Sequence, residues 1–124
     1  LVLDKDLSLP DSLHIFDGSV PTIVFTSKEK ESYNNVEYIR LDFSTSILPQ
    51  MMEVLYARNI QSLLVEGGSQ LLQSFLDENC WDEIFVEEAP FTLQDGVKAP
   101  IPPMDRLLET TPYFGRIITR YKRK

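Results

Sequence analysis

The stretch Asn59-Ile-Gln-Ser-Leu-Leu-Val-Glu-Gly-Gly-Ser-Gln-Leu-Leu72 decides the class of fold. Its residues 62–65 form a continuous apolar run, which is typical of a strand that is covered on both faces. Gly67 and Gly68 then turn the chain, and the apolar spacing that follows predicts a helix beginning near Ser69. The stretch therefore predicts a strand, a turn and a helix in succession, the unit from which α/β folds are built.

The segments on either side extend this pattern in both directions. Strands are predicted over residues 1–4, 22–26, 36–41, 82–88 and 114–121, and a further helix over residues 47–58. This helix connects its neighbouring strands in the manner of a parallel crossover, whereas no helix separates the last two strands, which can pair antiparallel. We predict one α/β domain over residues 1–124, with a mixed, mostly parallel sheet and flanking helices.

The amino-acid composition indicates which kinds of binding partner and which cellular compartment to expect. Nineteen acidic against twelve basic residues give a net charge of −7, which argues against nucleic-acid binding. The basic residues near the C-terminus are interpreted as a solvated strand end. No apolar stretch approaches the roughly 20 residues of a membrane span. Cys80 is the only cysteine, so no internal disulfide can form, and we expect a cytoplasmic protein.

The turn at Gly67 and Gly68 is the candidate ligand site. Ligands of open α/β sheets bind beyond the carboxyl ends of strands, and a helix start offers free N–H groups and a partial positive charge to a phosphate. Glu66, at the predicted strand end, could accept hydrogen bonds from a ligand. Taken alone, a tight turn without any ligand explains the two glycines somewhat better, since the segment is neither a G-x-G-x-x-G motif nor a P-loop.

Other residues that could take part in catalysis or bind a metal give weaker signals. His14 has no Cys or His cluster near it in the sequence, so a metal site has no support. Cys80 is interpreted as a packed or idle thiol rather than a nucleophile. Glu87 and Glu88 are adjacent on a predicted strand and point to opposite faces, so they cannot form a carboxylate pair. We therefore predict neither a catalytic side chain nor a metal ligand.

Several segments taken together resemble the reductase domain of RibD, a family of riboflavin biosynthesis with a dihydrofolate-reductase-like fold. The strongest part is the stretch quoted first, with its Val-Glu-Gly-Gly-Ser run. The resemblance covers nearly the whole chain. The segments that carry it are residues 1–10, 16–18, 21–26, 59–72, 81–84 and 96–100.

The resemblance implies an activity and a set of binding residues. It implies NADPH-dependent reduction of 5-amino-6-(5-phosphoribosylamino)uracil to 5-amino-6-(5-phosphoribitylamino)uracil, with NADPH carrying the chemistry. It implies a homodimer, and we expected the apolar Ile117 and Ile118 to form an edge strand that a partner covers. Glu66 matches the family's substrate-contacting glutamate. The cofactor-binding residues that the resemblance implies are Lys5, Gly68, Ser69, Gln70, Leu71, Leu72, Gln73 and Ser74.

The chain also departs from the family pattern. Residues 89–96 read Ala-Pro-Phe-Thr-Leu-Gln-Asp-Gly where the family usually has Pro-Lys-Leu-Leu-Gly and further glycines, and Ser8 stands at a commonly basic position. The family's first strand, its Asp…Arg substrate loop and the zinc-dependent deaminase domain have no counterpart here. We therefore expect a fragment that is weakly active or inactive by itself.

Two alternatives remain open from the sequence. The chain could be a non-catalytic nucleotide-binding or dimerisation module that kept the sheet and lost the reaction, a hypothesis that the altered Gln94-Asp95 loop favours. It could also be another dihydrofolate-reductase-like enzyme that acts on a different pyrimidine or pterin. Cofactor binding and the choice of substrate distinguish these alternatives from the first reading.

Overall fold

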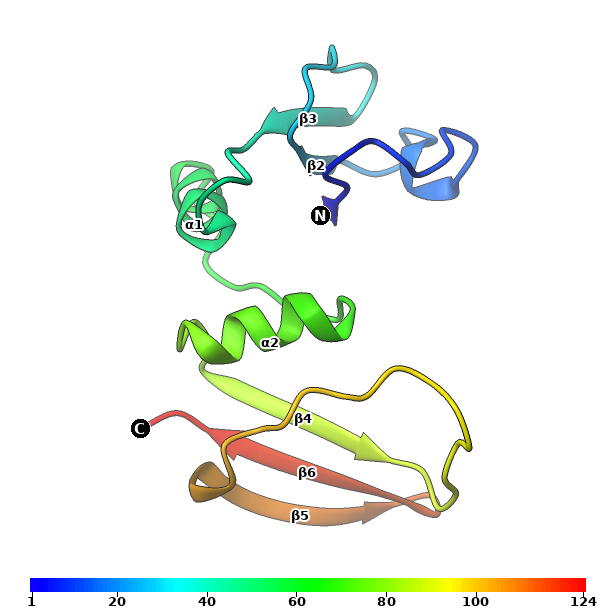
Figure 1. Ribbon diagram of the computed structural model, residues 1–124, viewed down its shortest axis with the longest axis vertical. Helices are drawn as coiled ribbons and strands as arrows, with labels where there is room; N and C mark the ends of the chain where they lie inside the picture. The colour runs from blue at the N-terminus through cyan, green and yellow to red at the C-terminus, as the bar shows by residue number, and fades with distance from the viewer. The chain divides into compact units, whose positions relative to one another are not determined.

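A computed structural model describes all of residues 1–124 as two compact units, Leu1–Leu63 and Leu64–Lys124, and each unit is described here by itself (Figure 1). Together they contain six strands and two α-helices. Three strands pair in parallel and three pair antiparallel. The predicted α/β class is therefore confirmed, with its strands distributed over two three-stranded sheets.

The first unit is built on a parallel sheet in the order β1-β2-β3, formed by β1 (Val2–Leu3), β2 (Thr22–Thr26) and β3 (Val36–Arg40). Its central strand β2 was predicted with the same bounds. The side chains of Val24 and Phe25 point to opposite faces and both are 0% exposed. A strand buried on both faces needs the continuous apolar run that the sequence supplies here.

One face of this sheet carries a small hydrophobic core. Phe16, Val24 and Val36 form a buried cluster, and Leu7 and Tyr38 pack against it. Phe16 reaches the cluster from η1 (His14–Phe16), a single 3-10 turn within a stretch that was predicted to be mostly loop. The side chain of Phe16 therefore holds the long connection between β1 and β2 against the sheet.

Helix α1 (Ile47–Ala57) completes the first unit and ends within one residue of its predicted bound. Leu48, Met51 and Leu55, spaced at helical intervals, form its buried face. Asn59 follows the helix with φ +56°, a left-handed conformation that asparagine tolerates and that stops the helix.

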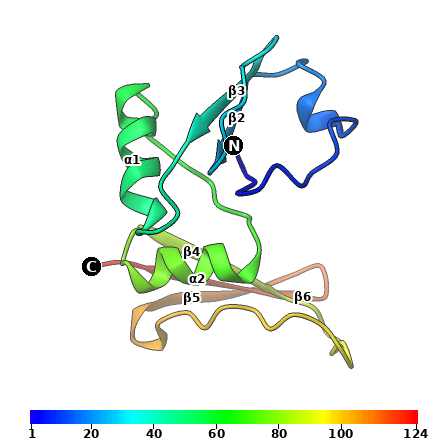
Figure 2. The same cartoon turned by 45° about the horizontal axis from the view of Figure 1, so that its top comes forward.

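The second unit combines one helix with an antiparallel sheet in the order β4-β6-β5. Its elements are α2 (Ser69–Asp77), β4 (Glu83–Glu88), β5 (Leu107–Tyr113) and β6 (Arg116–Lys122). Figures 1 and 2 show α2 running alongside this sheet. Phe75 of α2 and Tyr121 of β6 are its buried large apolar side chains, at 6% and 5% exposure.

Two expectations about strands were wrong. Residues 62–65 are irregular and do not form a strand, and Leu64 is 79% exposed. No strand of the chain pairs with this run, and an apolar run becomes a strand only when a neighbour completes its backbone hydrogen bonds. The final strand β6 is central, and not an edge, because β4 and β5 pair with it on both sides.

The strand that displaces β6 from the edge, β5, was not predicted from the sequence. It pairs with β6 through a tight turn in which Phe114 and Gly115 have φ values of +45° and +78°. Positive φ at both central residues is the geometry that matches the twist of a hairpin. Glycine adopts it at no steric cost, whereas the conformation is unfavourable for Phe114.

Arg120 of β6 joins the three strands of this sheet. Its guanidinium donates two hydrogen bonds to Glu83 of β4, at 2.8 and 2.9 Å, and one to Glu109 of β5 at 3.3 Å. Hydrogen bonding to Glu83, and then to Glu109, raises the pKa of Arg120. The same hydrogen bond with Arg120 lowers the pKa of Glu83. Both bonds to Glu83 come from one nitrogen, Nη2, and Nη1 donates to Glu109, so a single guanidinium pairs with two carboxylates.

Candidate functional site

The turn before α2 leaves its backbone open to the surroundings. A Cβ atom added to Gly68 would meet nothing within 4 Å, whereas one added to Gly67 would lie 2.8 Å from the Cδ2 atom of Leu71. Gly67 is therefore explained by close packing against the helix. Gly68, with φ −58° and ψ 163°, occupies the N-cap position and keeps free space beside the helix start.

The first turn of α2 has backbone donors without partners inside the helix. Its first helical hydrogen bond runs from the N–H of Leu72 to the carbonyl of Gly68 at 3.1 Å, so the amides of Ser69, Gln70 and Leu71 precede it. No side chain caps this end, and no acidic residue lies in the first turn. Neither a capping side chain nor an acidic residue of the first turn compensates the partial positive charge of the helix start, which suits an anion.

A shallow groove of about 380 Å³ runs along α2 within the second unit. Four of the eight residues expected to bind a cofactor line it. The side-chain amide of Gln73 donates to the Asp77 carboxylate at 2.7 Å, and the Ser74 hydroxyl donates to the Gln70 carbonyl at 3.0 Å. The lining residues are Ser69, Gln70, Gln73, Ser74, Asp77 and Lys98.

Lys98 and Asp77 were not among the residues singled out from the sequence. Lys98 lies in the irregular segment between β4 and β5, far along the chain from α2, and it supplies the positive charge of the groove. The one available signal was the likeness of residues 96–100 to the family, which marks the segment but assigns no role to its lysine. Leu71 and Leu72 do not line the groove and are half-buried.

Glu66 lies in the irregular segment just before the two glycines and is exposed. Because residues 62–65 do not form a strand, Glu66 does not mark a strand end as we had expected. Its carboxylate lies two residues before the N-cap of α2, in the same unit as the groove. Its role in substrate binding stays a prediction.

Lys5 belongs to the first unit and follows β1. Its backbone carbonyl accepts hydrogen bonds from the Ser27 amide at 2.9 Å, the Ser27 hydroxyl at 2.8 Å and the Thr26 hydroxyl at 2.9 Å. The ammonium group lies 5.8 Å from the centre of the Phe43 ring, within the range of a cation–π interaction. The backbone of Lys5 is thus fixed while its side chain stays exposed.

Asp4 fixes the loop that follows Lys5. Its buried carboxylate accepts hydrogen bonds from the amides of Ser8 and Leu9, both at 2.9 Å, and from the Ser8 hydroxyl at 3.2 Å. Burial raises the pKa of Asp4, but the hydrogen bonds from Leu9 and Ser8 outweigh it and hold that pKa below its ordinary value of 3.8. Ser8, at the position that is commonly basic in the family, therefore has a structural role here.

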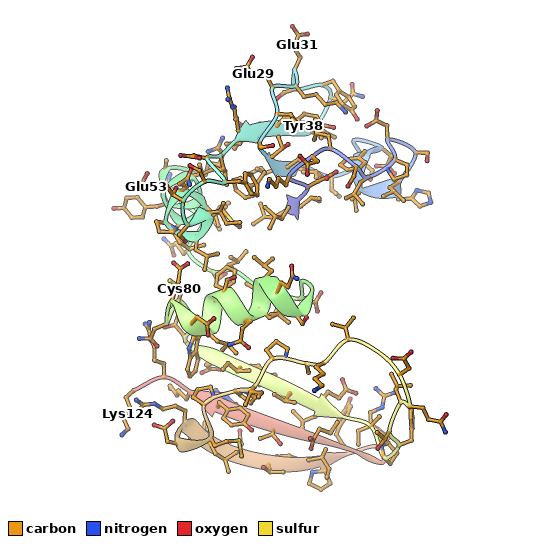
Figure 3. The ribbon with its side chains drawn as sticks, viewed as in Figure 1. Glu29, Glu31, Tyr38, Glu53, Cys80 and Lys124 are labelled. Atoms are coloured by element: carbon orange, nitrogen blue, oxygen red, sulfur yellow. The ribbon has the colours of Figure 1, made fainter.

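The remaining candidates from the sequence form no site. His14 is exposed and faces Asp17 at 3.7 Å. Cys80, labelled in Figure 3, is exposed after α2. No group of three or more histidine, cysteine, aspartate or glutamate side chains is placed to hold a metal ion. Neither α-helix has the length and apolar character that crossing a bilayer requires.

Comparison with known proteins decides the family. The model of the RibD C-terminal domain matches residues 1–107, most of the chain. The chain belongs to the RibD C-terminal domain family. The groove residues from Ser69 to Lys98 all lie inside the matched range, whereas β6 lies beyond it.

Relatives of this RibD C-terminal domain are longer proteins. The riboflavin biosynthesis protein RibD of Bacillus amyloliquefaciens is 28% identical over 108 residues, which cover 81% of this chain and 29% of that protein. The protein of the same name from Aquifex aeolicus (strain VF5) is 33% identical over 104 residues, covering 78% and 28% respectively. The chain thus spans less than a third of the length of these relatives.

A solved structure supports the fold of the RibD C-terminal domain. The crystal structure of a diaminohydroxyphosphoribosylaminopyrimidine deaminase/5-amino-6-(5-phosphoribosylamino)uracil reductase from Thermotoga maritima superposes with a TM-score of 0.79. The match covers 98% of this chain and 36% of that one, at 24% sequence identity. At this level of identity the likeness establishes the fold.

Proposed function

We propose that this chain is the reductase part of a RibD protein. In this proposal it takes part in the NADPH-dependent reduction of 5-amino-6-(5-phosphoribosylamino)uracil to 5-amino-6-(5-phosphoribitylamino)uracil. The observation that carries the proposal is the groove along α2, where residues that the family resemblance assigned to the cofactor lie side by side with a lysine. Family membership supports the reaction class, and the names of the relatives support the pathway.

The groove residues fit a dinucleotide phosphate. The uncapped amides of Ser69 and Gln70 can donate to phosphate oxygens, and the open space beside Gly68 allows the phosphate to come close to the backbone. Gln73 and Ser74 add polar groups further along the helix, suited to ribose hydroxyls. Bound NADPH would supply a hydride to C1 of the substrate's ribose.

The remaining residues act on position and not on bond making. Glu66, just before the turn, would accept hydrogen bonds from the substrate and orient it. Lys5, whose backbone carbonyl accepts hydrogen bonds from the Thr26 and Ser27 hydroxyls, stays a cofactor contact that the family resemblance alone implies. Reduction of this kind requires no nucleophilic side chain, since orientation supplies the protein's share of the catalysis.

A substitution at Gly68 tests the binding proposal sharply. Gly68→Ser introduces a good N-cap residue, which should stabilise the helix by a few tenths of a kcal/mol. The new hydroxyl would bond to the free amides and fill the space beside them, so NADPH binding should weaken. Binding is followed by amide NMR shifts of Gly67 and Ser69 during titration with NADPH and, for comparison, NADH. An unchanged affinity together with a raised melting temperature would refute phosphate binding at this turn.

The reaction itself is tested by NADPH consumption. Because the curated relatives are more than three times as long as the matched region, the assay uses the longest natural chain that carries these residues. Loss of NADPH absorbance with the phosphoribosylamino substrate is the expected result. Binding of NADPH without consumption would refute the reductase proposal and favour a non-catalytic module. Consumption with only another pyrimidine or a pterin would refute the substrate.

We also propose that the protein forms a homodimer in the cytoplasm. The second unit exposes many large apolar side chains, and surfaces of this kind commonly mark interaction sites. The mass measured by light scattering after size-exclusion chromatography tests the dimer, and a monomer at assay concentration would contradict it. Exposed examples are Phe91 at 70%, Leu93 at 73%, Val97 at 86% and Ile101 at 79%.

A further inference from the structure

Lys98 differs from most cationic side chains of the chain because it has no acidic partner. Eight of the twelve lysine and arginine side chains form an ion pair with a carboxylate. Of the four that do not, Lys98 alone lines the groove along α2. An anionic ligand could therefore pair with Lys98 without displacing an internal carboxylate.

The groove is electrically polarised along its length. Ser69 lies at the helix start, where the free amides carry a partial positive charge, and Asp77 lies at the helix end, where the partial charge is negative. The eight-residue separation corresponds to about 12 Å of helix. A phosphate is therefore favoured at the Ser69 end and repelled at the Asp77 end, where a carboxylate adds to the negative charge.

The charge of the whole chain makes a local cation more important. The net charge is −7, so an anionic ligand meets an unfavourable long-range field. A lysine in the lining of the groove offsets part of that repulsion. Because the lysine side chain is flexible, its ammonium group can pair with a phosphate oxygen in more than one geometry.

We propose that Lys98 is a phosphate-binding residue of the nucleotide groove. This inference rests on the proposed function, since it names a residue of the same site. The phosphate could be the pyrophosphate, which NADPH and NADH share, or the 2′-phosphate, which only NADPH carries. Both present the same chemistry to the ammonium group, and the choice of ligand in the experiment distinguishes them.

The test compares three variants of the whole protein in titrations with NADPH, NADH and 2′,5′-ADP. Lys98→Met removes the charge, and Lys124→Met is the matched control, because Lys124 also lacks an ion pair and lies at the C-terminus (Figure 3). Asp77→Asn keeps an acceptor for the Gln73 amide but removes the negative charge. Affinities are measured by NADPH fluorescence and amide shifts, at low and high ionic strength.

We expect opposite effects from the two groove variants. Lys98→Met should weaken phosphate-ligand binding about three- to tenfold, and Asp77→Asn should strengthen it about two- to threefold. Lys124→Met should leave it unchanged, and the differences should shrink at high salt because the groove is open to water. Equal weakening for NADPH and NADH assigns Lys98 to the pyrophosphate, and weakening for NADPH and 2′,5′-ADP alone assigns it to the 2′-phosphate.

The outcomes separate this inference from the proposed function. Wild-type binding with amide shifts at Ser69, combined with unchanged affinity in Lys98→Met, would overturn the role of Lys98 and leave the nucleotide site intact. Equal weakening in Lys98→Met and Lys124→Met would also overturn it, since net charge alone would explain the loss. Absence of any nucleotide binding by the wild-type protein would overturn both.

Discussion

Replacing Asp4 with alanine should unfold the first unit more easily at neutral pH. The Asp4 carboxylate is 6% exposed by residue and accepts hydrogen bonds from the amides of Ser8 and Leu9 and from the Ser8 hydroxyl. Alanine would leave these three donors without their acceptor. It would also loosen Ser8 and Leu9 in the loop that connects β1 to η1, because the hydroxyls of Thr26 and Ser27 hold only Lys5.

The magnitude follows from the number and the exposure of the donors. A hydrogen bond to a charged group contributes about 1.5–3 kcal/mol, so three would suggest a large loss. However, Ser8 and Leu9 are themselves exposed, and water can replace part of what the carboxylate supplied. We therefore expect Asp4→Ala to lower the free energy of unfolding by about 2 kcal/mol, and Asp4→Asn, which keeps one oxygen acceptor, by about 1 kcal/mol.

The effect should depend on pH with a definite sign. The pKa of Asp4 in the folded protein is lower than its ordinary value, so the ionised carboxylate stabilises the folded state above the unfolded pKa. This contribution is lost as the pH falls through the lowered folded pKa. The difference between wild type and Asp4→Ala should accordingly be largest at neutral pH and should shrink as the pH falls below 3.8, towards and through the lowered folded pKa.

Urea unfolding followed by far-UV circular dichroism measures the difference at each pH. Amide hydrogen exchange then locates it, because the amides of Ser8 and Leu9 should lose protection before those of β2. Equal unfolding free energies of wild type and Asp4→Ala at neutral pH would refute the reasoning. The reasoning would also be refuted if the difference in unfolding free energy persisted unchanged at low pH, because the carboxylate charge would then not be the cause of that difference.

Three further substitutions, one of them with a control at an exposed position, test other parts of the structure. Arg120→Met should lower the melting temperature and return the pKa of Glu83 towards its ordinary value, as measured in an NMR titration. Because the ion pair lowers the pKa of Glu83, its stabilisation should exist at neutral pH and vanish as the pH falls through that lowered pKa. An unchanged Glu83 titration would contradict the pairing. Phe25→Ala should lower the free energy of unfolding by about 3–5 kcal/mol in urea, whereas Phe85→Ala, at a 62% exposed position, should cost much less. Gly115→Ala should lower it by about 1 kcal/mol because φ is +78° there, and an unchanged thermal unfolding curve would show that the turn relaxes.

The elements that the sequence predicted well depend on local patterns. Strand β2 lies where a β-branched, apolar run is bounded by Pro21 and a polar segment, and α1 lies where apolar residues recur at helical spacing. Asn59 was expected to stop the helix, and its left-handed backbone shows how. In these cases the residues nearby contain all the information that the structure uses.

The elements that were misjudged depend on partners that are distant in the chain. Residues 62–65 have the composition of a buried strand, but no other strand pairs with them. β5 has little alternation and contains Pro112, yet it forms a strand because β6 folds back beside it after the turn at Phe114. The composition of a segment does not show which other segment pairs with it, so both errors have the same cause.

The candidate site was predictable in the same uneven way. The helix start at Ser69 was expected from the two glycines before it, and the structure leaves its amides uncapped. Lys98 could not be assigned because it reaches the groove from an irregular segment, where no periodicity relates a residue to its surroundings. The space beside Gly68, and the lack of it beside Gly67, required coordinates, since the sequence gives both residues the same letter.

The three-strand contact of Arg120 also restricts how the sheet can assemble. Arg120 shares a face with Phe85, whose ring centre is 5.5 Å away, while Thr119 and Tyr121 are buried on the other face. A slip of β6 by one residue would turn the guanidinium to the buried side, away from Glu83 and Glu109. An unpaired buried charge is far more costly than a lost surface contact. Arg120 therefore helps to set the strand register, because it disfavours shifted pairings of β6 that backbone hydrogen bonds alone would allow.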